Sequence, residues 1–68
     1  MNFKLIVMIV QDLVMEIEGI FILLGSKPHP KAIKSLEVHS PEALRAMRDD
    51  LKEEFEIKNP GKKVLTLS

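Results

Sequence analysis

The sequence predicts a small α+β protein, in which an antiparallel sheet built in the order β-β-β-α-β carries one amphipathic helix on one face. Three observations predict this class. Residues 3–24 are almost entirely apolar, residues 40–56 combine a helix start with an apolar stripe, and residues 64–67 resume an apolar pattern after a turn. This order of elements within 68 residues predicts a single domain that covers residues 1–68.

The stretch 3–24 is long enough to cross a bilayer, because about 20 mostly apolar residues suffice for a spanning helix. Three acidic residues interrupt it, namely Asp12, Glu16 and Glu18. A carboxylate near the centre of a spanning helix costs about 2.5 to 3.5 kcal/mol, so a single-span membrane peptide is the weaker alternative. No small-residue cleavage site follows the first apolar run, and this weighs against a signal peptide.

Alternation in the same stretch favours strands. Apolar side chains recur at every second position, namely Met15, Ile17, Phe21 and Leu23. Glu16 and Glu18 alternate with the first of them, as in a half-buried strand. Two strands need a turn, which we place at residues 11–13, since a turn of odd length separates charged side chains from the core. The predicted core face carries Phe3, Leu5, Val7, Ile9, Met15, Ile17, Phe21 and Leu23.

The second face of the predicted sheet carries Lys4, Glu16 and Glu18 together with more apolar side chains than a solvated face needs. A large exposed apolar surface typically marks a site of protein interaction. The sequence therefore predicts a protein interface on this face, formed by Ile6, Met8, Val10, Ile20 and Ile22.

The composition changes after the second predicted strand. Gly25 and Ser26 end that strand, and Pro28 and Pro30 predict a loop over residues 25–34, because proline lacks a backbone donor and favours extended or turn geometry. A weak alternation then predicts a short third strand through Ile33, Leu36 and Val38.

The helix has the clearest signals in the chain. Ser40 is the expected N-cap, Pro41 suits the first helical position, and Glu42 complements the positive helix start. An apolar stripe follows at spacings of three and four, and it is expected to pack on the sheet: Leu44, Met47, Leu51 and Phe55. Asn59-Pro60-Gly61 predicts a type II turn before a final strand over residues 64–67.

Residues that carry chemistry are few. The chain has no cysteine and only two histidines, His29 and His39, whereas a closed zinc site uses about four ligands. We therefore expect no metal and no cofactor. His39 precedes Ser40, but helix capping accounts for this serine, and the acidic residues from Asp49 to Glu56 are typical of a solvated helix face. The sequence predicts that the protein is not an enzyme and has no small-molecule substrate.

Small size directs the functional prediction toward association. Chains below about 70 to 80 residues usually need an additional source of stability, such as an oligomer. We expect a non-catalytic, cytoplasmic protein-protein interaction module. It is expected to form a homodimer or another homo-oligomer, or to bind another protein, through the apolar sheet face or a strand edge.

Lysine-rich loops support an alternative, a small nucleic-acid-binding or regulatory protein. The ten basic and ten acidic residues balance, but lysines gather in two segments that could contact phosphates: Lys27, Lys31, Lys34, Lys58, Lys62 and Lys63. The chain lacks tyrosine and tryptophan, so it offers few aromatic side chains for base stacking. The simpler explanation is that these lysines are solvated and bind nothing. This explanation favours the interaction module over nucleic-acid binding.

Overall fold

A computed structural model describes residues 3–62, which form helices joined by short turns and loops. The elements in chain order are α1 (Phe3–Leu23), α2 (Pro30–Ser35), a 3-10 helix η1 (Leu36–Val38) and α3 (Pro41–Lys58). No strand occurs among the described residues, so the predicted α+β class with its β-β-β-α-β sheet is wrong. The predicted strand over residues 64–67 lies outside the described part.

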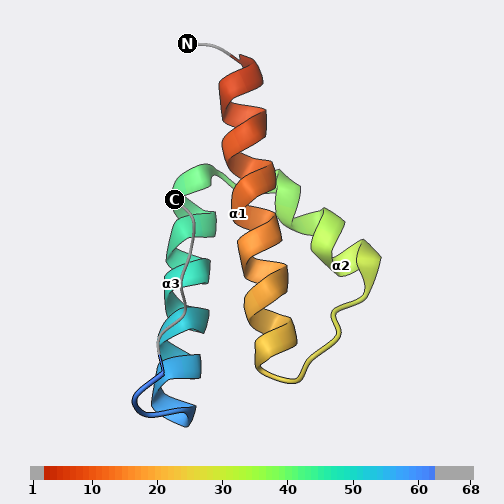
Figure 1. Ribbon diagram of the computed structural model, residues 1–68. Coiled ribbons are helices and arrows are strands. Elements are labelled where there is room, and N and C mark those ends of the chain that lie inside the picture. Colours follow the sequence, from red (N-terminus) through yellow and green to blue (C-terminus); the bar gives the residue numbers. More distant parts are fainter. Residues whose placement is uncertain (1–2, 63–68) are drawn as a thin grey trace.

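The two long helices lie side by side and run in the same direction, because α2 and η1 return the chain from the end of α1 to its beginning (Figure 1). Buried side chains on one face of α1 form most of the core, namely Val10, Leu13, Val14, Ile17 and Ile20. Leu44 of α3 is fully buried against this face, and half-buried side chains surround it: Ile33, Leu36, Met47 and Leu51.

The first helix overturns the predicted hairpin. Met15 and Ile17 share a face in a strand, but on a helix they lie about 200° apart. Ile17 is 0 % exposed and Met15 is 69 % exposed, so only a helix places them correctly. Strands rarely exceed about 10 residues, whereas α1 has 21 and contains no proline. An apolar run of this length without a turn signal favours a helix over two strands.

The end of α1 is fixed by glycine. Gly25 has φ 87°, a left-handed conformation that glycine adopts without steric cost. The backbone N–H of Ser26 donates to Phe21 O at 2.9 Å, and that of Gly25 donates to Ile22 O at 3.0 Å. These two bonds form a Schellman motif, a common way to end a helix. The Gly25-Ser26 break predicted from the sequence is therefore present, but it ends a helix.

The predicted proline loop and third strand are replaced by α2 and η1. Pro30 begins α2, where the first turn tolerates a residue that lacks an N–H. His29 caps this helix, because its Nδ1 accepts a hydrogen bond from the backbone N–H of Lys31 at 3.1 Å. The prolines were correct signals of a boundary. The prediction was wrong in giving the residues after Pro30 an extended conformation, because proline also suits the first position of a helix.

The predicted start of α3 is confirmed. Ser40 Oγ accepts a hydrogen bond from the backbone N–H of Ala43 at 3.2 Å, Pro41 follows the cap, and Glu42 lies in the first turn. The apolar stripe of α3 also forms, but its members Leu44, Met47 and Leu51 pack on the core side of α1 and not on a sheet. The turn after α3 is confirmed as well, since Gly61 has φ 87° and the Lys62 N–H donates to Asn59 O at 3.0 Å.

We expect Ser40→Ala to lower the free energy of unfolding by about 1 kcal/mol, because the Ala43 N–H loses its side-chain acceptor. Urea unfolding followed by circular dichroism measures the change. Ser40→Gly is the matched control, since glycine at an N-cap costs only a few tenths of a kcal/mol. A Ser40→Ala variant as stable as the natural chain would show that the hydroxyl does not act as a cap.

Candidate functional site

The side of α1 opposite the core carries large apolar side chains that the fold does not cover. Leu5 and Ile22 are each 57 % exposed, Met8 is 61 % exposed, and Met15 is likewise largely exposed. With two smaller or polar residues they form a line along the helix, which we call the outer stripe: Leu5, Met8, Asp12, Met15, Gly19 and Ile22.

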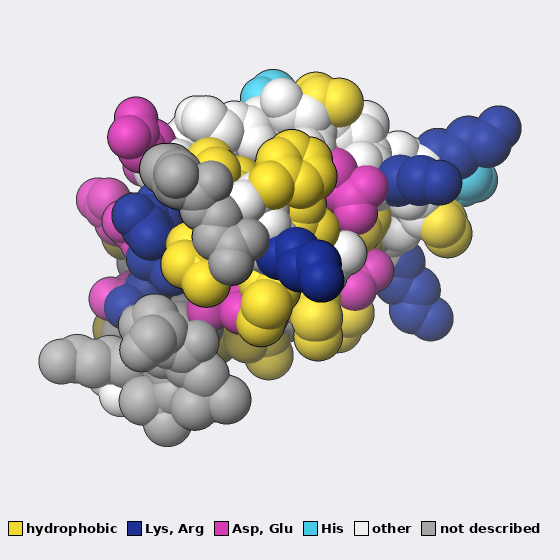
Figure 2. Space-filling model, turned by 90° about the horizontal axis from the view of Figure 1, so that it is seen from above, with side chains coloured by type: hydrophobic (Ala, Val, Ile, Leu, Met, Phe, Trp, Pro, Cys, Tyr) yellow, Lys and Arg dark blue, Asp and Glu magenta, His cyan; other side chains and the backbone are white. Residues whose placement is uncertain are grey.

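The spacing of the outer stripe alternates between three and four residues along its whole length. This is the spacing at which side chains stay on one side of a helix and can meet a partner helix. Single exposed apolar residues are ordinary, but several of them aligned on one side of a helix are typical of an interaction surface. Figure 2, which looks from above toward the N-terminal end of α1, shows hydrophobic side chains gathered around that end, with a Lys or Arg side chain among them and acidic side chains beside them.

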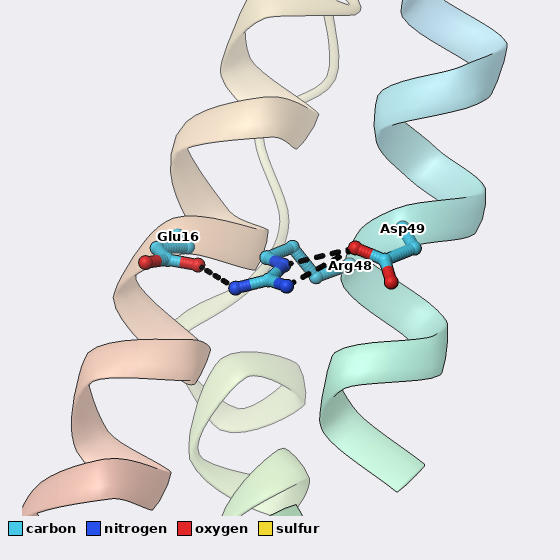
Figure 3. Close-up of polar contacts among 3 residues, drawn as sticks. All are labelled: Glu16, Arg48 and Asp49. Carbon is cyan, nitrogen blue, oxygen red and sulfur yellow. Dashed lines mark hydrogen bonds and ion pairs between the residues drawn. The ribbon is translucent and has the colours of Figure 1, made fainter. Parts of the chain in front are cut away.

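An ion-pair cluster lies between α1 and α3. Arg48 Nη1 donates to Glu16 Oε2 at 2.9 Å, and Arg48 Nη2 donates to Asp49 Oδ1 at 3.1 Å (Figure 3). The Glu16 and Arg48 side chains are each only 15 % exposed. This pair joins residues 32 positions apart in the sequence, so it links α3 to α1 beside the apolar contacts of Leu44.

The hydrogen bond to Glu16 is the main reason why the pKa of Arg48 is raised, while burial acts in the opposite direction and Asp49 adds a smaller increase. A raised pKa in the folded state stabilises the fold at every pH below the unfolded pKa of arginine, and this contribution is lost only as the pH rises through the folded pKa. The guanidinium therefore stays charged throughout the neutral range.

An apolar groove lies at the N-terminal end of α1. Its volume is about 560 Å³, and α1 lines it with Phe3, Ile6, Val7, Val10 and Gln11. Residues 37–41 line the other side, and they include His39 and Ser40. The Ser40 hydroxyl accepts a hydrogen bond from Ala43 in the helix cap, and the His39 side chain is exposed. The groove therefore offers mainly apolar side chains to a ligand, and the hydroxyl of Ser40 is already used to cap α3.

The interface residues predicted from the sequence divide between the two sides of α1. Met8 and Ile22 belong to the outer stripe, whereas Val10 and Ile20 are buried and Ile6 is half-buried. A strand face would hold all five, but a helix separates them. Leu5 and Met15 had been assigned to the sheet core. The signal that identifies them is helical spacing: Leu5 lies three residues before Met8. Met15 lies three residues after Asp12 and four before Gly19, which continue the same line to Ile22.

The lysines of the nucleic-acid alternative are not gathered at one place. Lys31 and Lys34 belong to α2 and Lys27 precedes it, whereas Lys58 ends α3. The α2 helix and the end of α3 lie on different sides of α1 (Figure 1). Lys58 Nζ also lies 3.7 Å from Glu54 Oε2. Lys62 is exposed, and Lys63 lies outside the described residues.

Two properties of the described chain bear on the remaining function classes. Among residues 3–62, no group of three or more His, Cys, Asp or Glu side chains is arranged to hold a metal ion. Within the same range, no helix combines the length and the apolar character that crossing a bilayer requires.

Comparisons of the chain with protein-family models, with curated proteins and with solved structures give no match.

Proposed function

We propose that the protein acts by binding another protein chain through the outer stripe of α1. The observation that carries this proposal is the line of four large apolar side chains, each 57 % exposed or more, that follow one another at three, seven and seven residues along one side of α1. The proposed role is non-catalytic and cytoplasmic, and it uses neither a cofactor nor a small-molecule substrate.

The different exposure of the two sides of α1 supports the proposal. The opposite side of the helix already supplies the core and meets α3 through Leu44. The outer stripe is therefore not needed to hold the described fold together. Exposing it to water has a cost that burial against a partner would remove, at about 25 cal/mol per Å² of apolar surface.

The test is a variant that charges the stripe. For Met8→Lys/Met15→Lys we expect the dissociation constant for association to rise about 100-fold or more, since burying each Met contributes about 1.5 to 3 kcal/mol and each 1.4 kcal/mol is tenfold. Both positions are exposed, so the helix content measured by circular dichroism should not change. Sedimentation equilibrium at micromolar concentration measures the association.

The matched control is Val38→Lys/Ile57→Lys. It also replaces two exposed apolar residues by lysines, but away from the outer stripe. Val38 lines the groove, so this control also tests that surface. If the control abolished association while the stripe variant retained it, the outer stripe would not be the interface.

A further inference from the structure

We infer that the partner of the outer stripe is a second copy of this chain, whose α1 docks antiparallel to the first. This inference rests on the proposed function, because it uses the same surface. Leu5 of one copy then contacts Ile22 of the other, Met8 contacts Gly19, and Asp12 contacts Met15. Each contact occurs twice, as a two-fold symmetric interface requires.

The outer stripe has the symmetry that such pairing needs. Its midpoint lies between residues 13 and 14, and every member has a counterpart at the same distance on the other side of that midpoint. Reversing the helix about this point therefore places stripe positions on stripe positions. An arbitrary stripe, with unequal spacing about its centre, would place some of its members against the flanks of the partner.

Side-chain size is complementary in the antiparallel arrangement. Gly19 has open space where a Cβ would lie, with nothing within 4 Å. The flexible Met8 side chain of the second copy can fill this space, since methionine adapts to irregular surfaces. In a parallel arrangement Gly19 would face Gly19 and leave a gap, while two Met8 side chains would compete for one layer.

Charge distinguishes the two arrangements further. A parallel pair would bring the two Asp12 carboxylates together within the seam, and like charges that face each other are destabilising. In the antiparallel pair each Asp12 lies beside Met15 of the other copy, so the two carboxylates lie in adjacent layers of the seam and not in one layer. Gln11 of one copy then lies near Glu18 of the other, where its amide can donate to the carboxylate.

A second copy also meets no long-range repulsion, because the formal net charge of the chain is +0. The outer stripe spans about 25 Å along the helix axis, at about 1.5 Å per residue. Two copies would therefore be joined over most of the length of α1. A small domain gains stability from such an association.

Cysteine cross-linking tests the orientation without ambiguity, because the natural chain has no cysteine. We expect a mixture of Leu5→Cys and Ile22→Cys proteins to form a mixed disulfide rapidly under mild oxidation. Each variant alone should cross-link slowly, because about 25 Å of helix would separate its two thiols, far beyond the Cα separation of under about 7 Å that a disulfide allows. Val38→Cys is the control for random collision.

The failures of this inference and of the proposed function are distinguishable. Rapid cross-linking of Leu5→Cys with itself would show a parallel pair, which overturns the inference and leaves the interface in place. A wild-type chain that stays monomeric in sedimentation at high concentration would also overturn it, since no second copy binds. The proposed function fails on a different result, an association that Met8→Lys/Met15→Lys does not weaken.

Discussion

Replacing Ile17 by alanine is expected to lower the free energy of unfolding by about 2 to 5 kcal/mol, the range for large-to-small substitutions in a packed core. Ile17 is fully buried at the centre of the cluster where α1 meets Leu44 of α3. The single core of a domain this small rarely supplies more than about 3 to 5 kcal/mol. Much of the population should therefore be unfolded, which urea denaturation followed by circular dichroism will measure.

Met15→Ala is the matched control, since it truncates an apolar side chain two residues away on the exposed side of the same helix. We expect it to change the free energy of unfolding by less than about 0.5 kcal/mol, as surface substitutions usually do. Both measurements belong at concentrations where the chain is monomeric, so that association does not contribute. Equal losses for Ile17→Ala and Met15→Ala would contradict the helix, because only a strand places both residues in one core.

The difference between α3 and α1 explains how much of the fold could be predicted from the sequence. The start of α3 has a specific local cause at each position: a capping hydroxyl at Ser40, a proline without an N–H at Pro41 and an acid at Glu42. These signals act within one turn of helix and require no knowledge of the rest of the chain. The turn at residues 59–62 was predictable for the same reason.

The α1 helix lacked such signals. The described helix has no acidic residue in its first turn, and apolar side chains occur on both its core side and its outer stripe. When both sides are apolar, a period of two and a period of 3.6 can each be found in the same residues. The length of the uninterrupted run was the better guide, because two strands would have needed a turn.

The candidate site was predictable only in part, for the same reason. Met8 and Ile22 were found because they are apolar at positions that a strand assigns to the outer face. Leu5 and Met15 were assigned to the core because a strand reverses their side. The contact of Glu16 with Arg48 was beyond prediction, since it depends on how two helices pack and not on any local pattern.

Arg48→Met is expected to lower the free energy of unfolding by about 1 to 3 kcal/mol, the range for removing a partner from a buried or charged hydrogen bond. The Glu16 side chain is only 15 % exposed, so its carboxylate would keep little hydration in place of the lost guanidinium. Methionine retains most of the apolar stem of arginine, and the loss should therefore report the charge and its hydrogen bonds. The control is Arg45→Met, an exposed position on the same helix, for which we expect less than about 0.5 kcal/mol.

A double-mutant cycle separates the pair from the residues around it. Glu16→Gln and Arg48→Met are measured singly and together, and direct contact predicts an interaction free energy of about 0.5 to 3 kcal/mol. Single and double variants whose losses simply add would mean that the pair does not couple α1 to α3. Coupling within that range would mean that this contact between residues distant in the sequence adds to the packing of Leu44 in holding α3 against the core side of α1. Because α3 lies on that side, the outer stripe stays open to a partner, which ties the stability of the fold to the surface that we propose for binding.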